Sequence, residues 1–316
     1  MMIESSFTYL TSDQQEIYAK KWLTEKGEQP RAIVQLSHGM AEHIARYEKF
    51  ARELVNQQIF VYGNDHRGHG NTGKMNNNPG YFADEDGFEK VVQDMAALTD
   101  IVEQDYPNVP IFLFGHSMGS FLSRRYIQLH GERLCGVILC GTGGDPGLIG
   151  KIGKFLAARE IKKQGRKAPS PFMNNLTFGS YNKNFRPVRT EFDWLTRDEK
   201  EVDKYINDSF CGGVFSSGFF YDLLQGLEII NKMENIKKVP VILPIYLISG
   251  SQDPVGNNTK GVLKTYQAFQ QAGIEDVSYK FFEDARHELL NELNKDEVQA
   301  DIIQWIKNIL AKKDIS

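Results

Sequence analysis

The feature of this sequence that most constrains its fold is a repeated alternation of short apolar runs, polar loops that contain glycine, and amphipathic segments. The amphipathic segments carry apolar residues at helical spacing, for example over residues 44–57 and 86–105. Strands that helices bury on both faces read as continuous apolar runs, so the alternation predicts an α/β fold with a mostly parallel sheet. The apolar runs of the first half, with their loops, lie at residues 31–39, 58–70, 109–115 and 134–141.

The alternation stops near residue 142 and resumes at residue 241. The intervening segment is partly helical in pattern, then basic, then interrupted by prolines and aromatic residues. We therefore expect a largely helical cap, inserted at 145–238, between two parts of one core, at 1–144 and 239–316.

A serine between two glycines follows the third apolar run and opens a helical segment. Gly115-His116-Ser117-Met118-Gly119 matches the pattern G-x-S-x-G. In the strand–turn–helix context that the sequence predicts here, this pattern forms a nucleophile elbow, in which the serine hydroxyl is exposed on a sharp turn. We therefore predict Ser117 as a catalytic nucleophile.

A serine nucleophile needs a base and a carboxylate, and both types occur in order after Ser117. Asp253 follows the apolar run that begins at residue 241, and His287 follows the run at 277–282. The order Ser, Asp, His along the chain is the order expected when a nucleophile elbow stands on a sheet of this kind. We predict that His287 accepts the proton of Ser117 and that Asp253 orients and stabilises the imidazole.

A serine hydrolase also needs two backbone N–H groups to hold the oxyanion. The N–H of Met118, at the start of a helix, is one candidate. The loop at residues 37–43 supplies the other, and we predict the N–H of Met40, beside the small residue Gly39. The remaining polar residues of that loop, which we expect to brace it or to line the pocket, are His38, Glu42 and His43.

A metal site is the rival interpretation of the histidine-rich loops. His66 and His69 have the spacing H-x-x-H, and Asp65 is adjacent. The turn is not helical in pattern and no third ligand follows at a characteristic spacing. We therefore expect no metal and no cofactor, and we assign these histidines to loop bracing.

Four stretches together resemble the monoacylglycerol lipase and lysophospholipase branch of the α/β-hydrolase superfamily, which includes serine aminopeptidase-like hydrolases. They are "HGMAEHIARYEKFA", "DHRGHGNT", "GHSMGS" and "ARHELLNE". The resemblance implies an eight-stranded sheet with a helical cap after the sixth strand. It also implies cofactor-free hydrolysis of esters between fatty acids and glycerol-type alcohols. Two departures from the family pattern are Ala41, where glycine is common, and Thr72, where serine is common.

The cap is expected to line the substrate pocket. Residues 148–156 place Leu148, Ile152, Phe155 and Leu156 on one helical face, within a segment rich in lysine. One interpretation is a lid that touches membrane or micelle surfaces transiently. The other, which we favour from sequence, is a buried stripe beneath a solvated face. The predicted substrate-binding residues are Gly39, His116, Leu148, Phe178, Tyr181 and Phe219.

Other functions on the same scaffold stay open. One is a carboxylesterase of small esters. Another is an aminopeptidase, which would need cap carboxylates to hold an ammonium group. A binder that has lost catalysis is disfavoured by the intact set of Ser117, Asp253 and His287. The candidate cap carboxylates are Glu191, Asp193, Asp208 and Asp222.

Composition limits the classes of binding partner and the cellular compartment that we expect for this protein. The net charge of −4 and the sequence pI of about 6.0 disfavour nucleic acid. The three cysteines lack metal-type spacing and favour reduced thiols. No signal-peptide pattern is evident at the N-terminus, so we expect a cytoplasmic protein. The sequence carries no indication of an oligomeric state.

Overall fold

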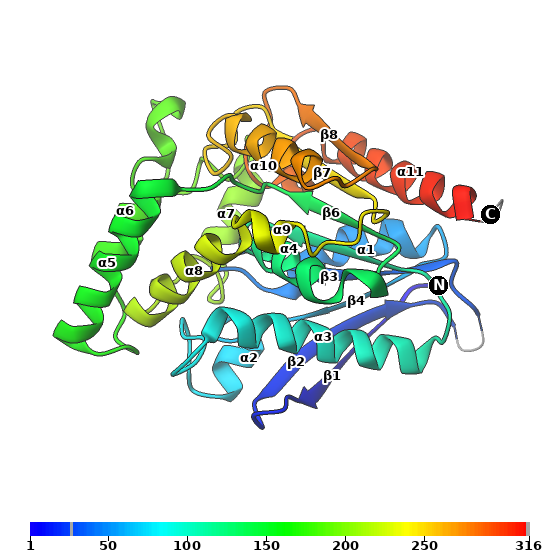
Figure 1. Cartoon of the computed structure of the whole chain (residues 1–316), viewed down its shortest axis with the longest axis horizontal. Helices are drawn as coiled ribbons and strands as arrows, with labels where there is room; N and C mark the ends of the chain where they lie inside the picture. The colour runs from blue at the N-terminus through cyan, green and yellow to red at the C-terminus, as the bar shows by residue number, and fades with distance from the viewer. Residues whose placement is uncertain (26–27, 314–316) are drawn as a thin grey trace.

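The core of the protein is one eight-stranded sheet. The computed structural model describes residues 1–25 and 28–313. The strand order is β1-β2-β4-β3-β5-β6-β7-β8. The first two strands form an antiparallel hairpin at one edge, β2 pairs antiparallel to β4, and the remaining neighbours are parallel (Figure 1). The strands are β1 Ile3–Leu10, β2 Glu16–Leu23, β3 Ala32–Ser37, β4 Ile59–Asn64, β5 Ile111–His116, β6 Gly136–Cys140, β7 Ile245–Gly250 and β8 Val277–Phe282.

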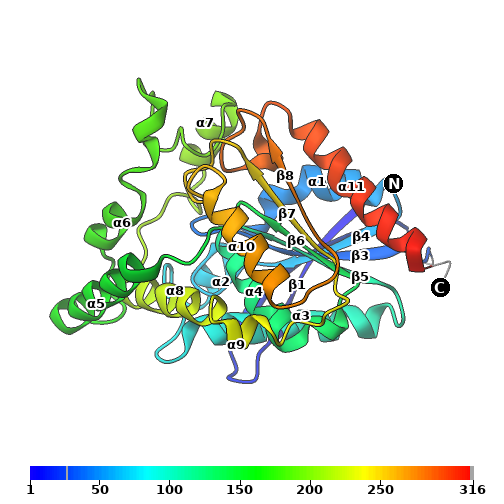
Figure 2. The same cartoon turned by 45° about the horizontal axis from the view of Figure 1, so that its top comes forward.

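Helices cover both faces of the sheet, as the continuous apolar runs predict. Every residue of β3, β4, β5, β6 and β7 is buried. One apolar cluster joins the sheet to helices α1 and α11, and another joins it to α3, α4 and α10 (Figure 2). The mostly parallel α/β sheet predicted from sequence is confirmed. These helices are α1 Glu48–Val55, α3 Gly87–Asp105, α4 Met118–His130, α10 Lys260–Gln271 and α11 Lys295–Lys313.

Between β6 and β7 the chain forms several helices. The first two, at residues 147–164 and 171–178, stand at one end of the sheet, opposite both termini, and later ones run back to pack on α3, α4 and α10 (Figure 1). Local capping explains where two of them begin: the Ser170 hydroxyl accepts a hydrogen bond from Met173 N, and the Ser216 hydroxyl accepts one from Phe219 N. We keep 145–238 as the proposed extent of the cap. Its helices are α5 Gly147–Gln164, α6 Pro171–Phe178, η3 Tyr181–Phe185, α7 Glu199–Asn207, α8 Ser217–Ile230 and α9 Met233–Ile236.

Helix α5 shows that the buried stripe expected at residues 148–156 is wrong for three of its four residues, Leu148, Ile152 and Phe155. Leu148 is 73% exposed and Phe155 is 67% exposed. The buried residues of this helix are small instead: Gly150, Gly153 and Ala157. A Cβ atom on Gly153 would lie 3.3 Å from the Leu224 side chain, so the small residues allow α5 to pack closely on α8. Leu148, Ile152 and Phe155 consequently face outward, whereas Leu156 packs partly buried against the core.

The remaining elements connect these layers. None of the helices in the described part of the chain combines the length and the apolar character that crossing a membrane requires. The connecting elements are α2 Gly70–Met75, η1 Ile44–Tyr47, η2 Gly131–Arg133 and η4 Leu289–Asn291.

Candidate active site

Ser117 lies on a sharp turn between β5 and α4. Its backbone has φ 52° and ψ −120°, a conformation that residues other than glycine rarely adopt. The flanking glycines permit this turn. A Cβ atom on Gly119 would lie 2.0 Å from the Ser37 carbonyl oxygen, and one on Gly115 would lie 2.5 Å from the Gly119 carbonyl oxygen. The geometry is that of a nucleophile elbow.

Asp253 and His287 meet at the carboxyl end of the sheet, although they follow different strands. His287 Nδ1 lies 2.9 Å and 3.0 Å from the two carboxylate oxygens of Asp253. The Val255 N–H and the Ser249 hydroxyl also donate to that carboxylate. These bonds require the Nδ1–H tautomer of a neutral imidazole, which leaves Nε2 free to accept a proton.

Both groups are buried, and each shifts the pKa of the other. Burial alone would raise the pKa of Asp253, but the adjacent His287 lowers it below its ordinary value. Burial alone would lower the pKa of His287, but the Asp253 carboxylate raises it above 6.5. The pair therefore favours an imidazolium, the species that forms when His287 takes a proton from a nucleophile.

Ser117 and His287 line the same cavity. Among the described residues, no hydrogen bond joins the Ser117 hydroxyl to His287. In unliganded enzymes such contacts are often long and shorten when substrate binds.

The two predicted oxyanion donors belong to the residue after Ser117 and to the loop that approaches Ser117 at Gly39. Met118 N begins α4, where the first N–H groups have no partner within the helix. Met40 follows Gly39, whose N–H donates to Glu42 Oε1 at 2.6 Å. A Cβ atom on Gly39 would lie 3.2 Å from the Ser117 Cβ atom, so the loop approaches the nucleophile closely.

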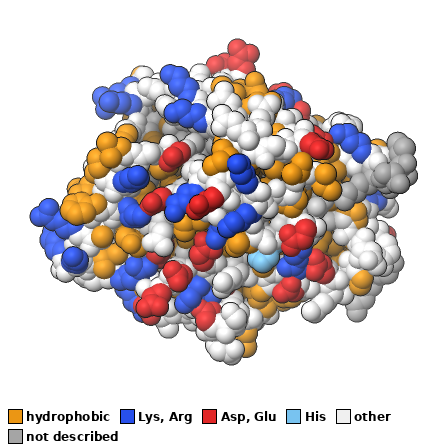
Figure 3. All heavy atoms as spheres, in the orientation of Figure 1, with side chains coloured by type: hydrophobic (Ala, Val, Ile, Leu, Met, Phe, Trp, Pro, Cys, Tyr) orange, Lys and Arg blue, Asp and Glu red, His pale blue; other side chains and the backbone are white. Residues whose placement is uncertain are grey.

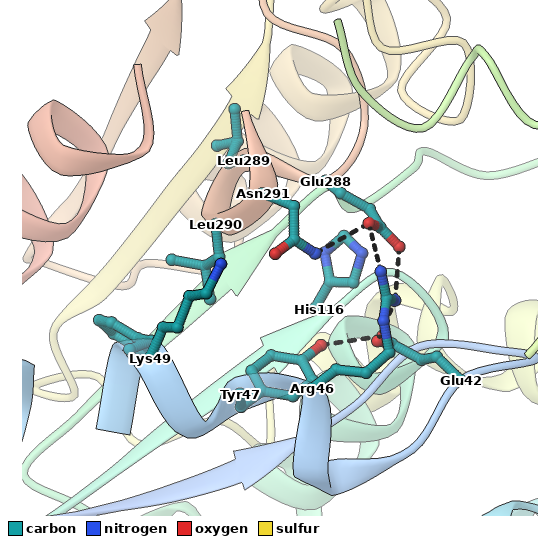
Figure 4. A pocket seen from close by; sticks show the side chains of 10 residues that line it. Glu42, Arg46, Tyr47, Lys49, His116, Glu288, Leu289, Leu290 and Asn291 are labelled. Carbon is teal, nitrogen blue, oxygen red and sulfur yellow. Dashed lines mark hydrogen bonds and ion pairs between the residues drawn. The ribbon is translucent and has the colours of Figure 1, made fainter. Parts of the chain in front are cut away.

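A buried ion-pair network joins this loop to Glu288, the residue that follows His287 (Figure 4). The Arg46 guanidinium donates a hydrogen bond to Glu42 at 2.8 Å. It also donates to both carboxylate oxygens of Glu288, at 2.7 Å and 2.8 Å. Glu42 also accepts from the Tyr47 hydroxyl. Burial would raise the pKa of Glu288, but the Arg46 guanidinium holds it well below its usual range. The expected bracing role of Glu42 agrees with these contacts, whereas sequence analysis missed Arg46 and Glu288.

The cap also holds the loop, at the position where the chain departs from the family pattern. Ala41 has φ 57°, a left-handed conformation that favours glycine. Its carbonyl oxygen accepts hydrogen bonds from the Tyr205 hydroxyl at 2.9 Å and from Gly212 N at 3.0 Å. These contacts from the cap stabilise the strained residue. At the second departure, the Thr72 hydroxyl donates to the Asp65 carbonyl oxygen at 2.7 Å.

The histidine-rich loops are braced by hydrogen bonds. His38 Nδ1 donates to the Gly39 carbonyl and His38 Nε2 accepts from His66 N–H. Burial lowers the pKa of His38 to about 3, so it stays neutral. The ring nitrogens of His66 and His69 bond Ser37 and the Arg67 carbonyl, respectively.

Within residues 1–25 and 28–313, one group of side chains offers metal-type ligands. It consists of His43, Asp208 and Cys211, whose ligand atoms lie within 4.8 Å of one another. His43 Nε2 and Asp208 already form a hydrogen bond at 2.8 Å, which ties the oxyanion loop to the end of α7.

The cavity above Ser117 has a volume of about 490 Å³, within the range of small-molecule sites. Of the predicted substrate-binding residues, Gly39, His116 and Phe178 line the cavity. Burial lowers the pKa of His116 to about 4, so its imidazole is neutral at neutral pH. Three others do not line the cavity. Leu148 faces solvent on α5, and Phe219 is buried against His69 and Phe82 in the core. The ring of Tyr181 packs on Trp194, which lines the cavity.

Comparison with known proteins decides the family. A family profile described as "Serine aminopeptidase, S33" matches residues 28–294, most of the chain. The chain belongs to this family. A solved structure of a thermostable carboxyl esterase from Bacillus coagulans, in complex with glycerol, is similar with a TM-score of 0.89 and 32% identity. The similarity covers 98% of this chain and 100% of the esterase.

Relatives of this S33 family member include lipases. Mouse (Mus musculus) monoglyceride lipase is 26% identical over 306 residues, 96% of this chain and 90% of that protein. The monoacylglycerol lipase of Mycolicibacterium smegmatis is 26% identical over 287 residues, 88% of each chain. The expected monoacylglycerol lipase branch of the α/β-hydrolases is confirmed, as is the expected enzyme class, a carboxylic ester hydrolase.

Proposed function

We propose that this protein hydrolyses esters between a fatty acid and a neutral, glycerol-type alcohol through an acyl-enzyme on Ser117. The observation that carries the proposal is the convergence of Ser117, the Asp253–His287 pair and the loop of Met40 on one cavity. The names of the relatives, monoglyceride lipase in mouse and a carboxyl esterase that binds glycerol, support the same substrate class.

The reaction follows from the arrangement of these groups. Ser117 Oγ attacks the ester carbonyl while His287 Nε2 takes its proton, and the N–H groups of Met40 and Met118 stabilise the oxyanion. The C–O bond to the alcohol then breaks, and His287 returns the proton to the departing alkoxide. Water, deprotonated by His287, attacks the acyl-enzyme and releases the fatty acid and Ser117.

The charge of the cavity wall favours a neutral alcohol over a phosphate-bearing one. Of the described residues that line the cavity, none is lysine or arginine, and the carboxylates are Glu42, Glu191 and Glu288. Glu42 and Glu288 are already paired with Arg46, so a phosphate group would meet the unpaired Glu191 carboxylate and would find no lysine or arginine on the wall. A related protein of Bacillus subtilis is named phospholipase YtpA, so a lysophospholipid is the second candidate.

The deciding experiment measures fatty acid release from a monoacylglycerol and from a lysophospholipid of equal chain length. We expect the monoacylglycerol to be preferred, and Ser117→Ala to lower turnover by roughly 10⁶-fold without unfolding. Ser180→Ala, an exposed serine of the cap, is the matched control. Faster release from the lysophospholipid would reverse the assignment of the alcohol. If a fluorophosphonate failed to label Ser117, the protein would be a binder rather than an enzyme.

We also propose that helix α5 contacts lipid or micelle surfaces transiently. Leu148, Ile149 and Phe155 are 73%, 81% and 67% exposed. The space-filling view shows apolar and basic side chains side by side over α5 (Figure 3). This combination is typical of interfacial helices.

The free thiols of Cys140 and Cys211 support a reducing, cytoplasmic location.

A further inference from the structure

The cap contacts the imidazole of His287 through an aromatic side chain. Trp194 belongs to the segment between η3 and α7, and its ring centroid lies 5.1 Å from that of His287, with an angle of 36° between the two rings. This angle is nearer to stacking than to an edge contact. Trp194 is buried and lines the cavity above Ser117, but none of the reaction steps uses it.

A second ring lies against His287 from the core. The ring centroid of His116, at the end of β5, is 4.7 Å from that of His287, with an angle of 44° between the rings. Because burial keeps His116 neutral, the catalytic imidazole has one uncharged ring beside it from the core and one from the cap. Of the two, the indole is the better partner for a cation.

Trp194 is held in place by the backbone on both sides of it. The Leu195 carbonyl oxygen accepts a hydrogen bond at 2.7 Å from the N–H of Glu288, which follows the catalytic histidine. The Asp193 carbonyl oxygen accepts one at 2.5 Å from the guanidinium of Arg286, which precedes the catalytic histidine. The neighbours of the indole along the chain are thus bonded to the neighbours of the imidazole.

Side chains farther along extend this contact between the cap and residues 286–292, which we call the histidine loop. The Thr196 hydroxyl donates to the Asn291 carbonyl oxygen at 2.9 Å, and Arg197 Nε donates to Glu292 at 2.9 Å. Glu292 is fully buried and also accepts from the N–H of Arg286 at 2.8 Å. The segment at 193–197 is therefore bonded to the histidine loop at several points, which fixes the position of its indole.

We infer that Trp194 is a positioning residue for His287, which holds the imidazole in place and stabilises the imidazolium that forms when Ser117 is deprotonated. The inference rests on the proposed function, in which His287 is the base. The face of an indole attracts a cation within about 6 Å of its centroid, and burial limits the screening of this attraction by water. Because the imidazolium forms with every ester, the effect should not depend on the alcohol or on the acyl chain.

The charged groups around the catalytic imidazole stay constant when the indole is changed. Asp253 bonds Nδ1, and the carboxylates of Glu42 and Glu288 also favour the charged ring. Both glutamates are paired with Arg46, and His116 is neutral. A shift in the pKa of the imidazole in a variant of the indole would therefore report on the indole itself.

The test replaces Trp194 by leucine and by phenylalanine in the full chain. Leucine keeps the site apolar but removes the ring face, so we expect kcat to fall about tenfold on a monoacylglycerol and on a dissolved short ester alike, with a smaller change in KM. The midpoint of the kcat/KM profile should move to lower pH, because the imidazolium loses a stabilising contact. Phenylalanine keeps a ring face and should restore most of the rate and of the midpoint.

Trp305→Leu is the matched control. Trp305, on α11, stacks on Tyr246 with ring centroids 5.5 Å apart and does not line the cavity. We expect this variant to lower the melting temperature and to leave kcat and the pH midpoint unchanged. If Trp194→Leu does not fold, Trp194→Met removes the ring with a more adaptable side chain.

Several outcomes would overturn the inference. An unchanged pH midpoint in the folded leucine or methionine variant would leave Trp194 with a structural role alone. A loss confined to one ester, or to KM, would make it a substrate contact. Phenylalanine no better than leucine would show that the ring face has no part. Absence of cleavage of either ester by the unaltered protein would instead refute the proposed function.

Discussion

On the sheet side of the cavity, Asp253, Glu42 and Glu288 each bond a cationic or neutral partner, whereas on the cap side the Glu191 carboxylate has no partner among the described residues. This difference suggests that the sheet side stabilises the transition state and that the cap side recognises the substrate. Groups that stabilise charge in a transition state must be held in place before the substrate arrives. Groups that recognise a substrate must stay available to it. We therefore expect changes on the sheet side to affect every substrate, and changes on the cap side, apart from Trp194, to affect some.

The largest effect should follow from Asp253→Asn. The amide can donate to Nδ1 and thereby select the wrong imidazole tautomer, so we expect kcat to fall by roughly 10⁴-fold on all esters. Steady-state rates on a monoacylglycerol and on a lysophospholipid of equal chain length measure this. Asp284→Asn, exposed in the loop after β8, is the matched control. A loss confined to one ester would contradict the division of tasks.

Arg46→Met should have the next largest effect. It frees the oxyanion loop from the segment of His287, and a small misplacement of reacting groups can cost about 10²-fold in rate. It also leaves Glu42 and Glu288 buried without their cation, which costs about 3–5 kcal/mol of folding stability. We expect kcat to fall on both esters with a smaller change in KM, and the melting temperature to drop.

The control for Arg46→Met is Arg52→Met, because Arg52 forms an exposed pair with Glu48 on α1. Exposed pairs of this kind contribute little to stability. If Arg46→Lys restored kcat fully, a single positive charge would suffice. If Arg46→Met left kcat unchanged, the network would have no positioning role.

The pH dependence tests the same side of the cavity. His287 must be neutral to act as a base, and its pKa is raised above 6.5 by Asp253. Activity should therefore fall as pH drops through a midpoint above 6.5, about tenfold per pH unit. Asp253→Asn removes the carboxylate, so the midpoint should move to lower pH. A wild-type midpoint below 6.5 in the kcat/KM profile would show that burial outweighs the carboxylate.

The sheet side was predictable because its signals are local. Ser117, Asp253 and His287 each follow an apolar run, and parallel strands bring their carboxyl ends to one edge. The Arg46–Glu288 contact joins residues that are 242 positions apart, so no local pattern could indicate it. Which cap residues line the cavity, among them Phe178 and Glu191, depends on how the segments from α6 to α7 fold over Ser117, which no local pattern indicates.

Helix α5 shows how a pattern can be correct and its interpretation wrong. Helical spacing shows that Leu148, Ile152 and Phe155 share a face, but not what covers that face. The sequence did carry the missing signal. Gly150, Gly153 and Ala157 also share a face, and small residues at such spacing allow two helices to approach closely. The burial of that face, seen in the structure, leaves the large apolar residues to solvent.

The smallest expected effect concerns these outward side chains. In the double variant Ile149→Ser/Phe155→Ser, less apolar surface is available to a lipid phase, so we expect about fivefold weaker binding to anionic vesicles. Hydrolysis of vesicle-borne monoacylglycerol should fall with it, while hydrolysis of a dissolved short ester should not.

Ile242→Ser, which changes a 78% exposed residue before β7, is the control for apolar exposure away from the cap. Binding by sedimentation at low and high salt measures the effect, because basic residues near the stripe make it salt-dependent. Equal binding by the variant and the unaltered protein, or binding indifferent to salt, would make the face of α5 a solvated surface and leave recognition to the cavity wall alone.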